Sequence, residues 1–137
     1  MFELDPVLAA DTLHVGDLPL CRVLLMNDSQ YPWLILVPRR SQAVELTDLD
    51  DADYQQYCRE SRHVASVMMA LYKGQKMNIA ALGNVVSQLH IHHVVRFHDD
   101  AAWPAPVWGK LPPVRYAKET SQHQLAQLQR VIFEETL

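Results

Sequence analysis

Three of the chain's seven histidines fall within the ten residues from Gln88 to Phe97. Read with the two-residue period of a β-strand, this stretch separates into two faces. One face is apolar apart from His93. The other face is mostly polar and carries Gln88, His90, His92, Val94 and Arg96. Solvent faces of strands are usually built from Lys, Glu, Thr and Ser, so two imidazoles in a row favour a functional site over plain exposure.

Chemistry alone leaves three interpretations of this face open. Two histidines at i and i+2 could share a zinc ion, but a stable site needs further ligands, and the other histidines form no recognisable pairing with them. Neutral imidazole is also a good nucleophile toward phosphorus, provided that its proton is held on the nitrogen that faces away from the substrate. The pair His90 and His92 fits this need, because the second imidazole can bond a phosphate oxygen. The third interpretation is structural, with polar side chains that meet water or a partner chain.

The composition of the chain limits the classes of fold, partner and compartment that fit it. A chain of 137 residues that is 49% apolar predicts a single domain, residues 1–137, with a hydrophobic core. A net charge of -4 argues against a nucleic acid polymer as partner, but not against small phosphorylated ligands. Cys21 and Cys58 lack metal-type spacing and fit a reducing compartment. We find no signal peptide and no apolar run of the ~20 residues that a membrane span needs, so we expect a cytoplasmic protein without a membrane partner.

The elements that must position the histidines form an α+β pattern. Short apolar runs predict strands, and three-and-four spacing of apolar residues predicts a long helix over 49–73, with Thr47 as its N-cap and Gly74 at its end. Residues 2–10 indicate an arm or short helical turn, and a C-terminal helix is expected from about Lys118. The predicted strands are 12–15, 21–26, 33–37, 77–82 and the histidine stretch itself. This order favours a mainly antiparallel sheet.

Residues 83–94, which read Gly-Asn-Val-Val-Ser-Gln-Leu-His-Ile-His-His-Val, resemble the signature of the histidine triad (HIT) superfamily. That signature alternates histidine with apolar residues and follows a Gly-Gln pair at a fixed interval. The triad could begin at His90 or at Gln88; we prefer Gln88, which keeps the distance to Gly83-Asn84. The order of elements over about 12–97 is similar to the family core. The Trp- and Pro-rich loop within 98–137 resembles that of a bacterial subgroup described only as histidine triad proteins or as diadenosine polyphosphate hydrolases.

The resemblance implies a five-stranded HIT-like sheet, a homodimer paired through strand and helix edges, and cleavage or transfer at the α-phosphorus of a nucleotide through a nucleotidyl-histidine. It implies no obligatory cofactor, although a divalent cation could accompany a polyphosphate substrate. His90 would be the nucleophile, the carbonyl of Gln88 would accept its Nδ1 proton, and His92 would contact the phosphate. The expected substrate-binding residues are Asn84 for a phosphate oxygen, Asn27 or Asp28 for the ribose, and Arg96.

Two departures from the family pattern keep an alternative open. Gln88 replaces the first histidine, and Val85 stands where many relatives carry Ser or Thr. A nucleotide-binding or regulatory module without catalysis is therefore the main rival to an enzyme. On the opposite strand face, His93 is expected to be an interior histidine. The loop with Trp103 and Trp108 is expected to pack against the protein, with contact to a base as the alternative.

Overall fold

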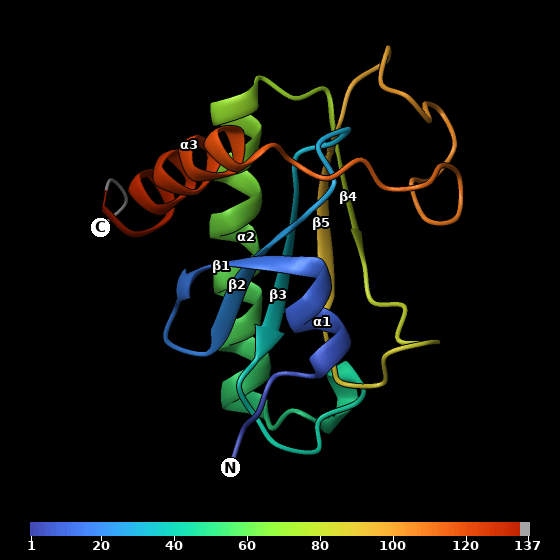
Figure 1. Cartoon of the computed structure of the whole chain (residues 1–137). Helices are drawn as coiled ribbons and strands as arrows, with labels where there is room; N and C mark the ends of the chain where they lie inside the picture. The colour runs from blue at the N-terminus through green and yellow to red at the C-terminus, as the bar shows by residue number, and fades with distance from the viewer. Residues whose placement is uncertain (135–137) are drawn as a thin grey trace.

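A five-stranded sheet forms the centre of the computed structural model, which describes residues 1–134 (Figure 1). The strand order is β1–β2–β3–β5–β4, and every neighbouring pair is antiparallel. The strands are β1 (Thr12–Asp17), β2 (Cys21–Met26), β3 (Trp33–Pro38), β4 (Lys76–Ala80) and β5 (Ile91–Arg96). The helices are α1 (Pro6–Asp11), the short 3-10 helix η1 (Leu46–Asp48), α2 (Asp51–Tyr72), α3 (Lys118–Gln129) and the π-helical segment η2 (Arg130–Glu134). The predicted α+β fold with one long helix and a C-terminal helix is confirmed.

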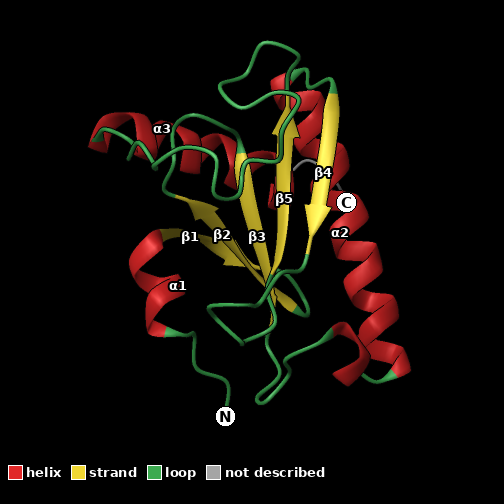
Figure 2. Cartoon of the chain, turned by 90° about the vertical axis from the view of Figure 1, so that its right-hand side faces the viewer, coloured by secondary structure: helices red, strands yellow, loops and turns green. Residues whose placement is uncertain are grey.

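Each face of the sheet is covered by different elements. The long helix α2 lies on one face, whereas α1 and the N-terminal segment lie on the other (Figure 2). All six residues of β3 are buried, which explains why this strand reads as a continuous apolar run rather than an alternating one. Leu34 and Leu36 pack on the α2 side, and Trp33 and Ile35 pack on the α1 side. The second face is the one that carries His90 and His92.

The start of α2 differs from the expectation. Its N-cap is Asp50, whose side chain accepts a hydrogen bond from the Asp53 N–H at 2.8 Å. Thr47 lies within η1 instead. The sequence Thr47 to Asp53 contains several residues that can cap a helix, and local propensity does not decide between them.

The end of α2 is also corrected. Lys73, not Gly74, adopts the left-handed conformation, with φ of 53°. Gly74 serves a packing purpose: a Cβ at this position would overlap the side chain of Val95 and lie 2.9 Å from the sulfur of Met69. The glycine therefore allows the chain to pass close to β5 as it enters β4.

The histidine strand begins later than expected. The N–H of Leu89 donates to the carbonyl of Ala43 at 2.9 Å, so residues 88–90 approach a loop rather than β4. Regular pairing starts at Ile91.

Within residues 1–134, no helix combines the length and the apolar character that a bilayer crossing requires.

Candidate nucleotide site

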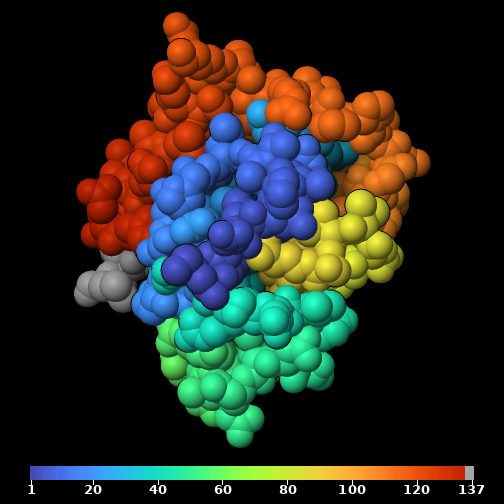
Figure 3. Space-filling view, turned by 60° about the horizontal axis from the view of Figure 1, so that its bottom comes forward, coloured from blue at the N-terminus to red at the C-terminus, as the bar shows by residue number. Residues whose placement is uncertain are grey.

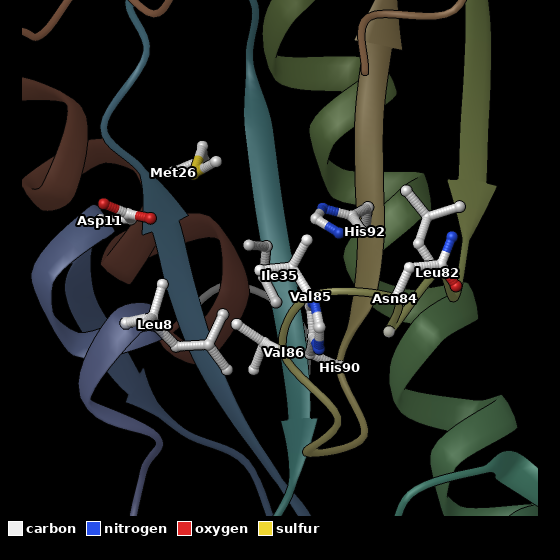
Figure 4. A pocket seen from close by; sticks show the side chains of 12 residues that line it. Leu8, Asp11, Met26, Ile35, Leu82, Asn84, Val85, Val86, His90 and His92 are labelled. Atoms are coloured by element: carbon white, nitrogen blue, oxygen red, sulfur yellow. The ribbon is translucent and has the colours of Figure 1, made fainter. Parts of the chain in front are cut away.

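A cavity of about 330 Å³ opens beside β5, between α1 and the connection that leads from β4 to β5 (Figure 4). Both predicted histidines, His90 and His92, and the predicted amide donor Asn84 line it. The remaining lining residues are Val7, Leu8, Asp11, Met26, Ile35, Leu82, Gly83, Val85 and Val86. The cavity therefore has a polar end at the histidines, an apolar middle, and one carboxylate on α1.

His90 immediately precedes β5 and is 7% exposed. Its Nδ1 lies 2.6 Å from the carbonyl oxygen of Gln88. A carbonyl can only accept, so Nδ1 carries a proton, and in the neutral imidazole Nε2 then keeps its lone pair. The hydrogen bond that we expected from the resemblance is present, and it depends on the backbone of residue 88 rather than on its side chain.

His92 lies two residues further along the same face, with its ring centroid 5.1 Å from that of His90. Its Nδ1 accepts a hydrogen bond from the indole Nε1 of Trp33 at 2.9 Å. Burial, together with the neighbouring His90 and His93, lowers the pKa of His92 to about 3. The ring is therefore neutral at physiological pH.

His93 occupies the opposite face, as expected, and is fully buried. Its Nε2 lies 2.7 Å from the hydroxyl of Ser61 on α2, and its Nδ1 lies 3.1 Å from the carbonyl of Ile91. Burial lowers the pKa of His93 to about 4, although the contact with the Ile91 carbonyl opposes this shift. This histidine holds β5 against α2 and takes no part in the cavity.

The connection between β4 and β5 forms one wall of the cavity. Gly83 adopts φ of 70°, a conformation that glycine accepts without strain. The turn places the exposed Asn84 on the cavity, opposite α1 (Figure 4). Val85 is 94% exposed, which makes the rim of the cavity apolar at this point.

The side chain of Gln88 points away from this cavity. Its Oε1 accepts from the N–H of Asp5, and its Nε2 donates to the carbonyl of Glu3, both at 2.8 Å. The amide thus fastens the N-terminal segment to the loop before β5, and Figure 3 shows these two segments side by side on the surface. This segment leads directly into α1, which supplies Leu8 and Asp11 to the cavity wall.

Asn27 and Asp28 are not brought to the cavity, so the structure does not support the ribose assignment made from sequence. Asn27 Oδ1 accepts from the N–H of Tyr116 at 2.9 Å. Asp28 is 4% exposed and accepts hydrogen bonds from Gln30 and from the N–H of Val114. Both side chains hold residues 114–116 against the end of β2.

Arg96 is likewise unavailable to a ligand, which corrects the substrate-binding assignment. It is 1% exposed. Its guanidinium donates to both carboxylate oxygens of Asp100, to Asn78 and to the carbonyl of Ala105, at 2.8 to 3.0 Å. These contacts leave it as the anchor of the loop that follows β5.

Sequence reasoning missed two site residues, Trp33 and Asp11. A signal for Trp33 existed, because a buried indole N–H needs an acceptor. For Asp11 the sequence offered no signal beyond the charge of its side chain.

Trp108 packs edge-on against both Trp33 and His92, at centroid distances of 6.2 and 5.4 Å. This packing agrees with the expectation for the Trp loop. Among residues 1–134, no three histidine, cysteine or acidic side chains are grouped as a metal site would require.

The comparisons with known proteins fit this geometry. The family model described as the HIT domain matches residues 8–99. A histidine triad protein from Marinobacter aquaeolei VT8, solved by crystallography, is 49% identical in sequence to this chain. The match covers 99% of each chain and gives a TM-score of 0.96. The histidine triad protein blr8122 from Bradyrhizobium japonicum is 45% identical over 96% of this chain and 98% of its own, with a TM-score of 0.94. Plasmodium falciparum diadenosine triphosphate hydrolase is 17% identical, over 98% of this chain and 82% of its own. Its TM-score of 0.64 shows a shared fold. No curated protein matches significantly.

Proposed function

The chain belongs to the histidine triad family, and from that premise we propose that it is an enzyme that cleaves or transfers at the α-phosphorus of a nucleotide. The observation that carries the proposal is the pair formed by His90 and the Gln88 carbonyl. It fixes the proton on Nδ1 and leaves the Nε2 lone pair of a cavity-lining histidine free to attack.

The proposed reaction has two displacements at phosphorus. In the first, His90 Nε2 forms a bond to the α-phosphorus while the bond to the leaving group breaks. The leaving group departs with that electron pair and takes a proton from solvent. In the second, water attacks the phosphorus, the N–P bond returns its electrons to Nε2, and the water's proton passes to solvent. His92 and Asn84, which line the same cavity, donate hydrogen bonds to the phosphoryl oxygens. The Gln88 carbonyl stabilises the cationic ring of the intermediate.

The charge of the cavity supports a substrate with one phosphoryl charge. None of its twelve lining residues is Lys or Arg, and Asp11 adds a carboxylate. A dinucleoside polyphosphate brings several negative charges, which need local cations or an accompanying divalent ion. A nucleoside phosphoramidate brings a single charge at the reacting phosphorus. We therefore place phosphoramidates before polyphosphates as substrates, with no obligatory metal cofactor.

The nucleoside would occupy the apolar part of the cavity. Leu8, Met26 and Ile35 line this part, and Asp11 closes it on the α1 side (Figure 4). Apolar side chains suit the faces of a base, and a carboxylate suits hydroxyl or amino donors. The proposed ribose or base contact thus moves from Asn27 and Asp28 to Asp11.

Turnover of adenosine phosphoramidate and of a diadenosine polyphosphate, measured by chromatography of the released nucleotide, tests the enzyme assignment. We expect release of AMP from the phosphoramidate, and its loss in His90→Asn. Unchanged turnover in His90→Asn would exclude His90 as the nucleophile. Tight nucleotide binding without turnover of either substrate would instead identify a binding module.

We also propose that the chain forms a homodimer through β4. This strand is at the edge of the sheet, with unpaired backbone groups. Ile79 on β4 and Leu82 just after it are 49% and 44% exposed. Sedimentation analysis of Ile79→Lys should show a shift to monomer. Val114→Lys, at an equally exposed valine on another surface, should leave the mass of the assembly unchanged, and a monomeric wild-type protein would overturn the proposal.

A further inference from the structure

Two tryptophans pack against His92, but they do so differently. The rings of Trp33 and Trp108 lie at similar distances from the imidazole, with centroids 5.6 and 5.4 Å away. Trp33 also donates its indole N–H to His92 Nδ1 at 2.9 Å. The indole nitrogen of Trp108 is buried and has no hydrogen-bond partner among the described residues. Ring packing and hydrogen bonding are therefore separable at this site.

The hydrogen bond from Trp33 determines where the His92 proton resides. An indole nitrogen can only donate, so His92 Nδ1 must offer a lone pair. In a neutral imidazole the proton then lies on Nε2, which is the nitrogen that remains for a ligand in the cavity. His90 is held in the opposite state, because the Gln88 carbonyl requires a proton on its Nδ1. Two adjacent rings thus present a lone pair and an N–H from equivalent nitrogens.

We propose that Trp33 is a positioning residue, which holds His92 as a neutral Nε2–H donor for a phosphoryl oxygen while His90 supplies the attacking lone pair. Trp33 is 5% exposed on β3, opposite Val94 in the register. Its ring is therefore fixed by the sheet before any ligand arrives, and the donor needs no reorganisation during the reaction. The role in turnover rests on the proposed function, whereas the proton position does not.

The neighbours of His92 limit it to donating a hydrogen bond. The nearest titratable groups are His90 on the same face of β5 and His93 on the opposite face, and Asp11 lies across the cavity. None of them supplies a negative charge in contact with the ring, and Trp33 offers no acceptor for a second ring proton. His92 therefore gives a hydrogen bond but transfers no proton, and the leaving group must obtain its proton from solvent.

The matched variants Trp33→Phe and Trp108→Phe test the proposal. Both remove an indole and keep an aromatic ring against His92. Long-range proton–nitrogen NMR correlations report which ring nitrogen carries hydrogen, and His92→Asn identifies the His92 signals. In the wild type and in Trp108→Phe we expect an unprotonated Nδ1 and a protonated Nε2. In Trp33→Phe we expect both nitrogens to move to intermediate shifts, as two tautomers exchange.

Kinetics provide the second readout. Trp33→Phe should lower kcat by about tenfold or more, since one transition-state donor is no longer fixed, with little change in KM. Trp108→Phe should not show this loss. A protonated Nδ1 in the wild type, or an unchanged tautomer in Trp33→Phe, would overturn the proposal. Absence of turnover in the wild type, with the NMR pattern intact, would instead count against the proposed function alone.

Discussion

Arg96 and Asp100 form a two-pronged ion pair inside the protein, with Nε–Oδ2 and Nη2–Oδ1 distances of 2.8 and 3.0 Å. The two side chains are only 1% and 4% exposed. Asp100 also accepts hydrogen bonds from the backbone N–H groups of Phe97, Ala102 and Trp103. One carboxylate thus organises the turn after β5 and, through it, the Trp loop that reaches His92.

Removing one partner of this pair should be costly. Burial by itself raises the pKa of Asp100, but Arg96 and the backbone donors lower it to about 2. Arg96→Leu leaves the carboxylate buried without its partner, so we expect the free energy of unfolding to fall by about 3–5 kcal/mol. Urea denaturation of the variant measures this loss.

A surface pair provides the control for that experiment. Arg40 and Asp53 have similar geometry, but the Arg40 side chain is 51% exposed. Arg40→Ala should therefore cost no more than about 1 kcal/mol. If Arg96→Leu lowered the free energy of unfolding as little as Arg40→Ala does, Arg96 would not be the anchor that we describe.

A second prediction concerns acid stability. Both His92 and His93 titrate near 6.5 when unfolded, but their pKa values are about 3 and about 4 in the folded chain. Between these limits the unfolded chain binds protons that the folded chain does not. The free energy of unfolding must then fall as pH drops from about 6 to about 4, by roughly 1.4 kcal/mol per pH unit for each histidine.

The variant His93→Gln tests the size of that effect. It removes one of the two groups, so the slope of stability against pH should fall by about half, as measured by denaturation at several pH values. His123→Gln, at an exposed position on α3, controls for the loss of an imidazole. An unchanged slope in His93→Gln would contradict the assignment.

The sequence predicted the parts of the site that depend on local periodicity. The pleat alone separated His93 from His90 and His92. The family resemblance, rather than the periodicity, placed Asn84 beside them and assigned the carbonyl of Gln88 to His90. That carbonyl remains in place because a backbone group survives any change of side chain. The fold followed from apolar runs whose lengths suit strands and one long helix.

The sequence could not predict contacts between distant segments. The family resemblance suggested ligand contacts for Asn27, Asp28 and Arg96, and the chemistry of their side chains was compatible with such contacts. Asn27 and Asp28 instead bind the backbone of Tyr116 and Val114, which approach because the chain after β5 folds back over the sheet. Arg96 pairs with Asp100, four residues later, in the turn that follows β5. The bond from Trp33 to His92 spans 59 positions. Such pairings depend on tertiary packing, which no period of two or 3.6 encodes.

The Gln88 side chain gives a third prediction. Gln88→Ala removes two hydrogen bonds to the backbone of Glu3 and Asp5, which should lower the free energy of unfolding by about 1–2 kcal/mol. Hydrogen exchange at the Asp5 amide should accelerate. Turnover should change little, because the carbonyl that holds His90 remains.

The variant Gln88→Glu separates the two bonds. It keeps an acceptor for the Asp5 amide and loses the donor to the Glu3 carbonyl, so Asp5 should stay more protected than in Gln88→Ala. Equal exchange rates at Asp5 in all three proteins would show that this clamp does not hold the N-terminal segment.

Asn84 allows the phosphate end of the cavity to be tested without altering a histidine. Its side chain is exposed on the cavity wall, so its replacement should not affect folding. Asn84→Ala removes one hydrogen bond of about 1 kcal/mol, which corresponds to roughly fivefold weaker binding of AMP. Asn84→Asp should bind more weakly still, because a carboxylate repels the phosphate. Calorimetric titration at fixed salt measures both, and Ser87→Ala on the same connection, outside this cavity, is the control. If both Asn84 variants bound AMP as the wild type does, the phosphate would have to lie elsewhere.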